Sequence, residues 1–421
     1  MSAAAPIGGS VDDWLDWQLA LHDTEIELGL DRVAAVARTL EVLPPPGRSV
    51  VVAGTNGKGS CVALIESLLS HHGRVGSYTS PHLWRYNERI RIDGAPVADT
   101  DLCAAFAAVE AARGGVALTF FEFGTLAALW LFARAALDFL VLEVGLGGRL
   151  DAVNVVDGDV ALVTNIGLDH VAWLGDDREQ IGFEKAGIFR AGRPAVCADR
   201  DMPASIAERA ATQGTPLAVI GRDFDLQAQD DRWCWRDGDA ALDIPAQAGV
   251  LVENLAAALS VVRRLGAAVR DEHVIAAARV QAALPGRRER VVDGDVAIIY
   301  DVGHNAEAIA VLVDDLARQP VPGRTHVVLG MLADKPVEAA GGRLRDLADA
   351  LYIAGLDTVT DRGLPAAALA KRLASDAPCH PDPATALAAA CAASAAGDRI
   401  VVCGSFFTVA NARRQTLSCR T

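Results

Sequence analysis

The segment Gly54-Thr55-Asn56-Gly57-Lys58-Gly59-Ser60 constrains the fold of this chain more than any other feature. It follows the apolar run 50–53 and precedes an amphipathic stretch, residues 60–71. This context predicts a strand, a glycine turn and a helix, whose first backbone N–H groups are able to hold phosphate oxygens. Lys58 adds a positive charge within reach of the terminal phosphates. The sequence therefore predicts a nucleotide-binding protein.

The glycine loop departs from the standard P-loop motif. Two residues separate Gly54 from Gly57, which is a shorter spacing than the standard motif has. Gly59 stands where that motif places a Ser or Thr. Because the missing hydroxyl normally binds Mg²⁺, we expect the metal ligands to come from elsewhere in the chain.

Apolar segments of strand length alternate with helical segments along most of the chain. The alternation predicts an α/β fold with a doubly wound, mostly parallel sheet. In the N-terminal part, the expected strands are 49–53, 75–79, 138–144, 159–165 and 194–198. The expected helices are two within 11–40, then 57–72, 100–113, 122–137, 178–189, 254–264 and 271–283.

A break in this pattern divides the chain into two expected domains, because 421 residues are too many for one ordinary core. The break is the segment Leu284-Pro285-Gly286-Arg287, followed by a polar stretch. We predict a P-loop domain over 1–284, a linker over 285–295 and a smaller Rossmann-like α/β C-terminal domain over 296–421. The expected elements of the smaller domain are strands 296–301, 325–330, 350–354 and 399–404 and a helix over 306–319.

Composition excludes several classes of function. The net charge of −15 argues against nucleic acid as a partner. No run approaches the roughly 20 apolar residues that span a bilayer, and the N-terminus lacks the features of a signal peptide. The eight cysteines include no CxxC pair, so neither a zinc site nor a disulfide framework is indicated. We expect a monomeric cytoplasmic protein with no membrane or nucleic-acid partner.

Polar residues follow several expected strands at their carboxyl ends, where ligands bind in open α/β sheets. Ser80 follows strand 75–79 and is a candidate for the missing hydroxyl, although a Ser-Pro turn explains it equally well. Glu143 ends a strand ahead of a glycine loop, as an acid that holds Mg²⁺ does. His170 follows strand 159–165 and is a candidate ligand of metal or phosphate, whereas a lone His is more often structural.

The expected second domain begins with a similar polar group. Asp301, His304 and Asn305 follow its first strand and predict a polar site. The alternative is that Asn305 caps a helix and His304 packs against it. Arg287 and Arg288, just upstream, are able to reach phosphate or carboxylate groups.

Ten segments, taken in order, resemble one family. They are AGTNGKGS (53–60), SPHLWRYNERIRI (80–92), TFFEFGTLAALWLF (119–132), LEVGLGGRLDAVNVVD (142–157), TNIGLDHVAWLG (164–175), EKAGIFR (184–190), LPGRRE (284–289), YDVGHN (300–305), LGMLADKP (329–336) and VCGSFFTV (402–409). In these segments the chain is similar to the bacterial bifunctional dihydrofolate synthase/folylpolyglutamate synthases, which are relatives of the Mur ligases. The resemblance extends from about Trp14 to Val409.

The resemblance implies an ATP-dependent ligase of folate biosynthesis. In this family the γ-phosphate of ATP is transferred to a substrate carboxylate, and L-glutamate then displaces phosphate from the acyl phosphate. One reaction joins glutamate to dihydropteroate, and the other extends a folate glutamate chain through its γ-carboxylate. Two Mg²⁺ sites and a monovalent cation such as K⁺ are also implied. The protein's part is to position anionic reactants and to neutralise their charge.

The resemblance also implies site residues at the matching motifs. The ATP residues are Thr55, Asn56, Gly57, Lys58, Gly59, Ser60, Asn254, Arg287 and Asp301. The metal ligands are Ser80 and Glu143 for one Mg²⁺ and His170 for the second. The catalytic residues are Lys58, His170, a carbamylated Lys185, and His304 and Ser405, which place the incoming glutamate. The pterin residues are Glu27, Leu28, Gly29, Leu30, Thr119, Phe120, Phe121, Glu122, Leu150, Asp151 and Ala152.

The pterin residues help to decide which reaction the chain catalyses. Phe121 offers a stacking face, and Glu122 or Asp151 offers a hydrogen-bond partner for the ring. Family members that only extend folates tend to lack the loop at 26–30, so both activities are expected. A Mur-like ligase with another acceptor, a small-molecule kinase and an inactive nucleotide-binding regulator are the alternatives. The chain departs from the common family pattern at three positions, which are Glu27, Arg288 and Gly303.

Overall fold

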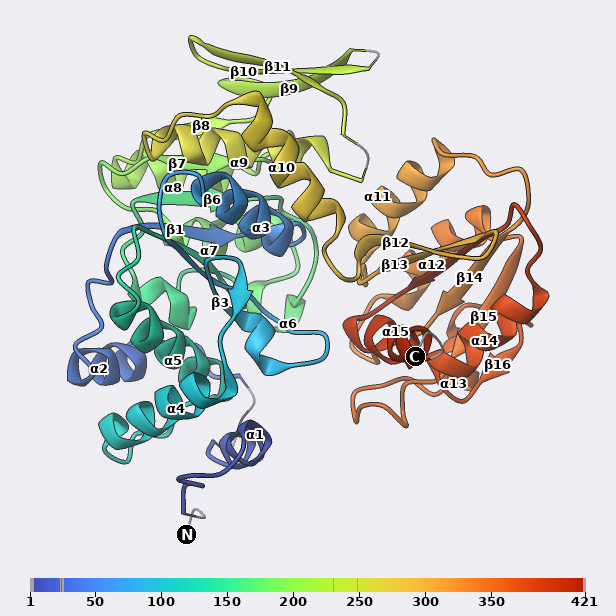
Figure 1. The fold of residues 1–421 in the computed structure, drawn as a ribbon, viewed down its shortest axis with the longest axis horizontal. Helices are drawn as coiled ribbons and strands as arrows, with labels where there is room; N and C mark the ends of the chain where they lie inside the picture. The colour runs from blue at the N-terminus through green and yellow to red at the C-terminus, as the bar shows by residue number, and fades with distance from the viewer. Residues whose placement is uncertain (1–3, 23, 25, 230, 248, 419–421) are drawn as a thin grey trace. The chain divides into compact units, whose positions relative to one another are not determined.

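The computed structural model describes residues 4–22, 24, 26–229, 231–247 and 249–418, with the side chains of 415–418 outside that set. Contacts divide the chain into two compact units, Met1–Gln281 and Ala282–Thr421 (Figure 1). Both units have an α/β architecture, as the alternation of strands and helices predicts. None of the described helices is both long and apolar enough to cross a membrane.

One large sheet forms the centre of the first unit. Its strands are β1 (Arg48–Ala53), β2 (Val75–Tyr78), β3 (Ile90–Ile92), β4 (Ala95–Pro96), β5 (Phe139–Glu143), β6 (Val160–Val163), β7 (Ala195–Cys197) and β8 (Leu217–Val219). Their order across the sheet is β4-β3-β2-β5-β1-β6-β7-β8. The six strands from β2 to β8 in that order are parallel, whereas β3 and β4 extend one edge in antiparallel fashion. The five expected strands and the mostly parallel sheet are confirmed.

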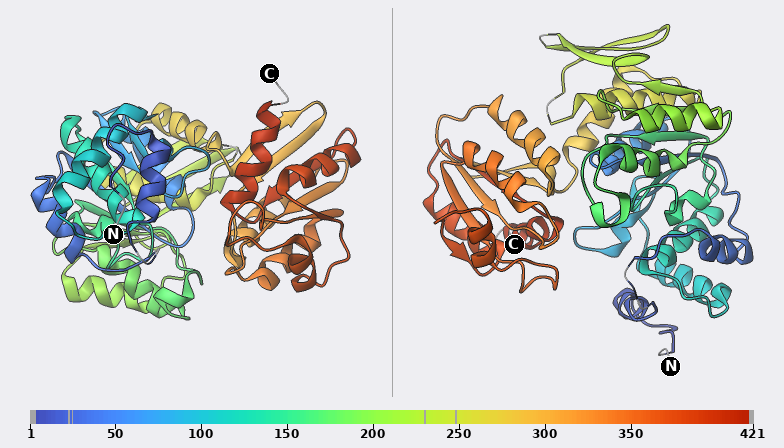
Figure 2. Two further views of the ribbon diagram at one scale, coloured as in Figure 1. Left: turned by 90° about the horizontal axis from the view of Figure 1, so that it is seen from below. Right: turned by 180° about the vertical axis from the view of Figure 1, so that it is seen from behind.

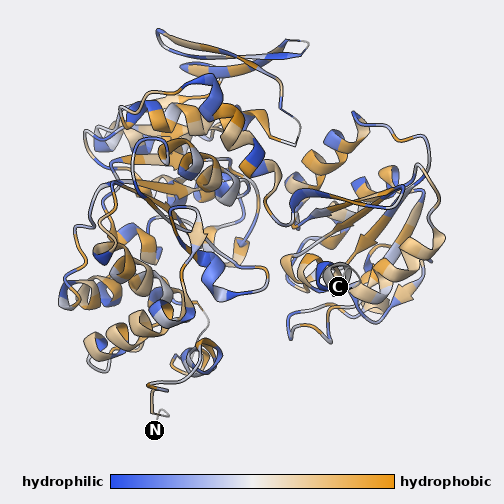
Figure 3. Cartoon of the chain, in the orientation of Figure 1, coloured by the Kyte–Doolittle hydropathy of each residue, from blue (hydrophilic) through white to orange (hydrophobic). Residues whose placement is uncertain are grey.

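Helices cover both faces of this sheet. One face carries α1 (Val11–Leu19), α2 (Asp31–Thr39), α4 (Asp99–Arg113), α5 (Phe120–Arg134), α7 (Arg178–Lys185) and α8 (Ala204–Gln213). The other face carries α3 (Lys58–Leu69), α9 (Val252–Arg264) and α10 (Asp271–Ala282). Val51 and Ala53 of β1 belong to the first core and Val50 and Val52 to the second, because alternate residues of a strand face opposite sides. Figure 3 shows this apolar central layer.

Short single-turn helices lie in the loops at the carboxyl edge of the sheet and close to it. They are η1 (Tyr86–Arg89), η2 (Ala152–Val155), α6 (Val171–Leu174) and η3 (Ala186–Ile188). Each follows or interrupts a segment that carries polar residues of the expected site.

A separate antiparallel sheet packs on α9, and the pattern of alternating strands and helices did not predict it (Figures 1 and 2). It consists of β9 (Phe224–Gln229), β10 (Arg232–Asp237) and β11 (Ala240–Pro245). Trp233 and Trp235 of β10 are buried against the helix, and Trp235 Nε1 donates to Ala256 O at 3.3 Å. The sequence signal is the alternation of these two tryptophans with polar residues, which is typical of a strand with one buried face.

The second unit contains one sheet of six strands in the order β12-β13-β17-β14-β15-β16. The strands are β12 (Arg287–Asp293), β13 (Val296–Asp301), β14 (Thr325–Leu329), β15 (Ala350–Ala354), β16 (Cys379–His380) and β17 (Arg399–Cys403). The helices are α11 (Ala306–Ala317), α12 (Val337–Leu347), α13 (Ala366–Arg372), α14 (Pro383–Ala393) and α15 (Phe406–Ser418). All strands except β12 run parallel, and the four expected strands are confirmed.

The structure corrects the expected linker over residues 285–295. Arg287–Asp293 form strand β12, which pairs antiparallel with β13 and belongs to the sheet of the second unit. β12 lies at the edge of that sheet, and none of its residues is fully buried. An edge strand needs no continuous apolar run, and this is why its polar sequence resembled a linker.

Candidate active site

Two glycines determine the shape of the loop between β1 and α3. Gly54 has a φ of 148°, and a Cβ atom built there would lie 1.7 Å from Thr164 Oγ1. Gly57 has a φ of 81° at the start of α3, and its Cβ position would lie 2.7 Å from Asn254 Oδ1. Glycine is therefore required at both positions, for backbone conformation and for space.

Hydrogen bonds fasten this loop to the segment that follows β6. The backbone N–H of Thr55 donates to Asn165 O at 2.8 Å, and that of Asn56 donates to Asn165 Oδ1 at 2.7 Å. Thr55 Oγ1 donates to Gly167 O at 3.1 Å, and Thr164 Oγ1 donates to Asn56 O at 2.6 Å. The carboxyl ends of two neighbouring parallel strands thus support each other, as the sheet order predicts.

Lys58 lies over the glycine loop. Its Nζ donates to the carbonyl oxygens of Gly54 at 3.1 Å and Thr55 at 3.2 Å. Lys58, Gly59 and Ser60 form the first turn of α3, where backbone N–H groups have no acceptor within the helix. A cation and a helix N-terminus at one place form a site suited to phosphate groups.

Replacing Gly54 by alanine is expected to weaken binding of an ATP analogue by at least about tenfold, because the loop must move away from Thr164. The free energy of unfolding should fall by about 1–3 kcal/mol from the clash and the strained φ. Gly192→Ala is the matched control, since Gly192 has a φ of 69° but nothing within 4 Å of the added Cβ. Calorimetric titration and urea unfolding measure both quantities, and unchanged binding in Gly54→Ala would contradict the expectation.

Two of the expected metal ligands lie together. Glu143 is the last residue of β5 and is 2% exposed, and its Oε2 accepts a hydrogen bond from the Ser80 N–H at 3.2 Å. A carboxylate and a hydroxyl are the hard oxygen ligands that Mg²⁺ prefers. Among the residues that the structure describes, no group of three or more His, Cys, Asp or Glu is arranged to hold a metal ion.

His170 stands at the start of α6 with a φ of 52°. Its side chain is 38% exposed, and its Nε2 lies 4.0 Å from Asp169 Oδ2. The left-handed backbone places a solvent-accessible imidazole at the carboxyl edge of the sheet, just after the segment that supports the glycine loop.

Lys185 is a buried lysine that contacts the glycine loop. Its residue is 4% exposed, and its Nζ donates to Gly54 O at 2.9 Å. Burial, and then the nearby charge of Lys58, lower the pKa of Lys185 to about 7. Near neutral pH a large share of its side chains is therefore uncharged, unlike those of an ordinary surface lysine.

The glycine-rich segment after β5 connects Lys185 to the expected pterin residues. A Cβ atom on Gly148 would lie 2.8 Å from Lys185 O, and one on Gly145 would lie 2.7 Å from Phe121 Cζ. Further along, the N–H of Gly29 donates to Leu150 O at 3.1 Å. These contacts bring together the segments 26–30, 119–122 and 145–152, which hold the residues that the resemblance implies for the pterin.

Arg32 ties two of these segments together, and the sequence analysis missed it. Its guanidinium pairs with the Glu27 carboxylate and, at 2.9 Å, with Glu122 Oε1. His22 Nε2 lies 2.9 Å from the other oxygen of Glu27. The available signal was weak, since Arg32 is one arginine in the first turn of an amphipathic helix.

The two acids considered for the pterin ring already have partners. Glu122 is 3% exposed and caps its own helix, with Oε2 accepting the Thr119 N–H at 2.8 Å. Asp151 is also buried, and its two oxygens accept the N–H groups of Leu146 and Val153, each at 2.9 Å. Burial raises the pKa of Asp151 to about 7 despite these bonds. Asp151 is therefore the acid whose protonation state is open near neutral pH.

In the second unit, His304 and Ser405 follow two neighbouring parallel strands, β13 and β17. The N–H of Gly404 donates to Gly303 O at 3.1 Å, which joins the two loops. Ser405 is 2% exposed, and its Oγ lies 2.7 Å from Thr408 Oγ1. The His304 Nδ1 lies 3.0 Å from Val302 O. The pairing of the strands thus brings together two residues about a hundred positions apart.

The other three residues expected to bind the nucleotide differ in the contacts that they make within the protein. Asp301 accepts the N–H groups of Gly303 at 2.7 Å and Arg288 at 3.1 Å, and burial raises its pKa. The Arg287 guanidinium lies 6.0 Å from the centre of the Phe406 ring. Asn254 is 7% exposed beside Gly57, and its Nδ2 is buried with no hydrogen-bond partner among the described residues. An unused buried donor beside the glycine loop is consistent with a ligand contact.

Family models match most of the chain. The Mur ligase middle domain matches residues 52–262, and the Mur ligase glutamate ligase domain matches residues 286–406. The two matches fall within the two compact units of the fold.

Individual proteins are similar over nearly the whole length. The dihydrofolate synthase/folylpolyglutamate synthase of Escherichia coli is 43% identical over 410 residues, which are 97% of this chain and 95% of that protein. A solved structure of E. coli FolC in complex with DHPP and ADP has a TM-score of 0.94 at 41% identity and covers 99% of both chains. A bifunctional folylpolyglutamate synthase/dihydrofolate synthase with Mn, AMPPNP and L-glutamate bound has a TM-score of 0.91 at 42% identity, with 100% of both chains covered.

Proposed function

This chain belongs to the dihydrofolate synthase/folylpolyglutamate synthase family of Mur ligases, and we propose that it catalyses both reactions of that name. It joins L-glutamate to dihydropteroate and to the γ-carboxylate of tetrahydrofolate glutamates, with conversion of ATP to ADP and phosphate. The relatives support each substrate class, because their structures contain DHPP with ADP, or AMPPNP with Mn and L-glutamate.

One observation carries the proposal of dihydropteroate as a substrate. Three segments far apart in the chain meet where Gly145 approaches Phe121, where Gly29 bonds to Leu150, and where Arg32 pairs with Glu27 and Glu122. Lys185 contacts both Gly148 and the glycine loop. An aromatic face, buried acids and a phosphate site side by side suit a pterin whose carboxylate must meet the end of ATP. A ligase with a different acceptor has no need of this arrangement.

In the first step a carboxylate oxygen of the acceptor attacks the γ-phosphorus of ATP, and the bond from that phosphorus to ADP breaks. Lys58 and the N–H groups at the start of α3 hold the phosphates and balance the charge that moves toward ADP. Asn254, beside Gly57, contributes to this site in the first unit, and Arg287 and Asp301 are the nucleotide residues that we propose for the second unit. Mg²⁺ held by Ser80 and Glu143 would supply further positive charge, with His170 as a ligand of a second Mg²⁺.

In the second step the amine of L-glutamate attacks the carbonyl carbon of the acyl phosphate. The amine loses a proton, the bond from carbon to phosphate oxygen breaks, and phosphate leaves. His304 and Ser405 place the glutamate, and Thr408 fixes the Ser405 hydroxyl. Reaction of the Lys185 amine with CO₂, with release of a proton, would provide a carboxylate beside the glycine loop, and a bound monovalent cation such as K⁺ would balance part of the negative charge.

The test is phosphate release by the purified protein with Mg²⁺ and ATP. Release should require dihydropteroate and L-glutamate together, and tetrahydrofolate should replace dihydropteroate. Oxygen-18 in the acceptor carboxylate should appear in the released phosphate, which a kinase that stops at phosphoryl transfer would not produce. Failure of every pteroate and folate to support release would overturn the proposal.

Arg32→Met is expected to weaken dihydropteroate binding by about tenfold, because Glu27 and Glu122 lose the cation that joins them. Affinity for an ATP analogue should change by less than about twofold, since the ion pairs of Arg32 are with the pterin segments and not with the glycine loop. Arg38→Met on the exposed side of the same helix is the control, because Arg38 Nε bonds to Ala34 O of that helix. Equal loss of affinity for both ligands in Arg32→Met would point to a general loss of structure.

The proposal includes a monomeric protein that acts in the cytoplasm. Size-exclusion chromatography with light scattering measures the mass in solution and tests this part directly.

A further inference from the structure

Arg89, the last residue of η1, is buried without a carboxylate partner. It is 8% exposed, and its guanidinium lies 5.0 Å from the centre of the Tyr86 ring and 5.5 Å from that of Phe120. Its Nε donates to His82 Nδ1 at 2.8 Å. None of the ion pairs formed by the described residues includes Arg89, whereas nearby Arg85 pairs with Asp99 at 2.7 Å.

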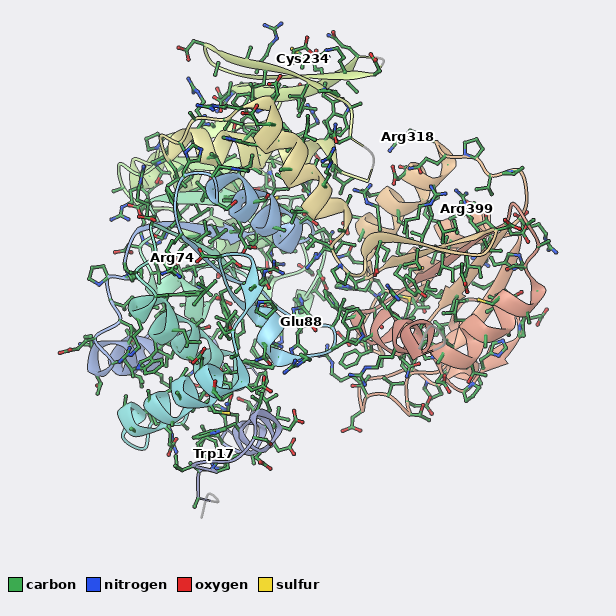
Figure 4. All side chains as sticks on the ribbon, in the orientation of Figure 1. Trp17, Arg74, Glu88, Cys234, Arg318 and Arg399 are labelled. Carbon is green, nitrogen blue, oxygen red and sulfur yellow. The ribbon has the colours of Figure 1, made fainter. Side chains whose placement is uncertain are left out.

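The neighbouring acid, Glu88, forms no ion pair with Arg89 among those of the described residues. Glu88, labelled in Figure 4, uses its carboxylate to accept the backbone N–H groups of Leu83, Trp84 and Arg85 at 2.8, 2.9 and 2.8 Å. It therefore organises the loop that carries Arg89. Burying a guanidinium without a paired carboxylate reduces the stability of the fold. The buried position of Arg89 therefore favours a role in binding a ligand over a role in stability.

The outer nitrogens of Arg89 are available to a ligand. They make no hydrogen bond with the described residues, and they are not among the polar atoms that are fully enclosed without a partner. His82 takes the Nε donor and so holds the guanidinium plane in one orientation. Two parallel donors in a fixed plane match the two oxygens of a carboxylate.

Arg89 borders the place where the acceptor is expected to react. Phe120, against which it lies, begins α5 and belongs to the pterin residues. Arg89 also acts electrostatically on Tyr78, whose ring lies 5.8 Å from that of Phe121. The loop that carries Arg89 begins with Ser80, which contacts Glu143. An acceptor between these groups would bring an aromatic ring to Phe120 and an acid toward the metal ligands.

We propose that Arg89 is a specificity-determining residue that binds the benzoate carboxylate of dihydropteroate. The inference rests on the proposed function and adds the residue that recognises the acid to be activated. Carboxylates on the glutamate tail of a folate share this chemistry, but the flanking Phe120 favours a carboxylate borne by an aromatic ring.

The experiment compares dihydropteroate with its analogue that carries hydrogen in place of the carboxylate, by calorimetric titration without ATP. Wild type should bind dihydropteroate about tenfold to a hundredfold more tightly than the analogue, as expected for a charge-assisted pair. Arg89→Met should bind both compounds alike, at the wild-type affinity for the analogue, and Arg89→Lys should fall between. Arg85→Met, on the same loop but exposed, should discriminate as wild type does.

Three other outcomes are possible, and each would overturn or reassign a different part of the proposal. Equal loss of affinity for both compounds in Arg89→Met, with unchanged affinity for an ATP analogue, would overturn the inference and assign Arg89 a structural role. Discrimination against a tetrahydrofolate whose glutamate carboxylates are amides, without discrimination between the pteroates, would assign Arg89 to the glutamate tail instead. Absence of dihydropteroate binding in wild type would overturn the proposed function itself.

Discussion

Replacing Lys58 by alanine is expected to lower kcat/KM for ATP by about a hundredfold to a thousandfold. This is the range found when one preorganised charge-stabilising group is removed from an active site. The ammonium lies over the glycine loop, within 3.2 Å of two of its carbonyl oxygens, and is the cation closest in sequence to the phosphate site. Without it, the charge that moves toward ADP in the transition state loses its main protein partner.

The fold should tolerate this substitution. The Lys58 ammonium donates to backbone oxygens of its own loop and the side chain is half-buried, so its removal should change the free energy of unfolding by less than about 1 kcal/mol. Urea unfolding measures this, and phosphate release with dihydropteroate and glutamate measures the rate. Lys371→Ala, an exposed lysine on α13, is the control and should leave both unchanged. A loss below about tenfold in Lys58→Ala would contradict its role.

Lys185→Ala is expected to lower kcat by about a hundredfold or more, with partial recovery when acetate or formate is added. The small acid would occupy the space of the missing carbamate and supply its negative charge. No recovery with any short carboxylate would argue that the amine itself, rather than a carbamate, is the functional group.

Because the pKa of Lys185 is lowered, the rate at which its carbamate forms should depend on pH near neutrality. Carbamylation joins the neutral amine to CO₂ and releases a proton. Because burial lowers the pKa to about 7, the neutral fraction should rise from about a tenth at pH 6 to about nine tenths at pH 8. At the same concentration of dissolved CO₂, enzyme depleted of CO₂ should therefore regain activity faster at pH 8 than at pH 6.

A direct observation of the carbamate completes this test. Carbon-13 NMR of protein incubated with labelled bicarbonate should show one protein-bound carbamate signal. The signal should be missing in Lys185→Ala and present in Lys371→Ala. Full activity without bicarbonate, together with no signal in wild type, would contradict the assignment.

Much of the fold was predictable because its main signals are local. The run Val50–Ala53 is apolar at every position, which is typical of a parallel strand buried on both faces, and β1 is such a strand. Strands β9 to β11 and β12 were missed because each contains polar positions that are exposed or only partly buried, and these positions resembled loops. Trp233 and Trp235 were the signal that a search for alternation would have found.

The candidate site residues also divide into those with a local sequence signal and those without one. Lys58, Glu143 and His304 could be proposed from the sequence because each lies at or just after the carboxyl end of a recognisable strand, where parallel sheets bind ligands. Arg32 and Arg89 could not be proposed from the sequence because no local pattern marks them. Arg32 is separated by 90 positions from Glu122, with which it pairs. The distinguishing feature of Arg89 is a buried guanidinium that forms no ion pair among the described residues, and only the structure shows it.

The sequence by itself determined the alternation of strands and helices, the glycine loop and the set of polar residues at strand ends, since each depends on periodicity or spacing within a short segment. Only the tertiary structure decided which of these residues are buried and what they contact. Lys185 is ordinary in sequence, and its lowered pKa arises because folding buries it against Gly54, 131 positions away, beside Lys58. Desolvation and charge proximity depend on the packing of distant segments, which no local pattern encodes.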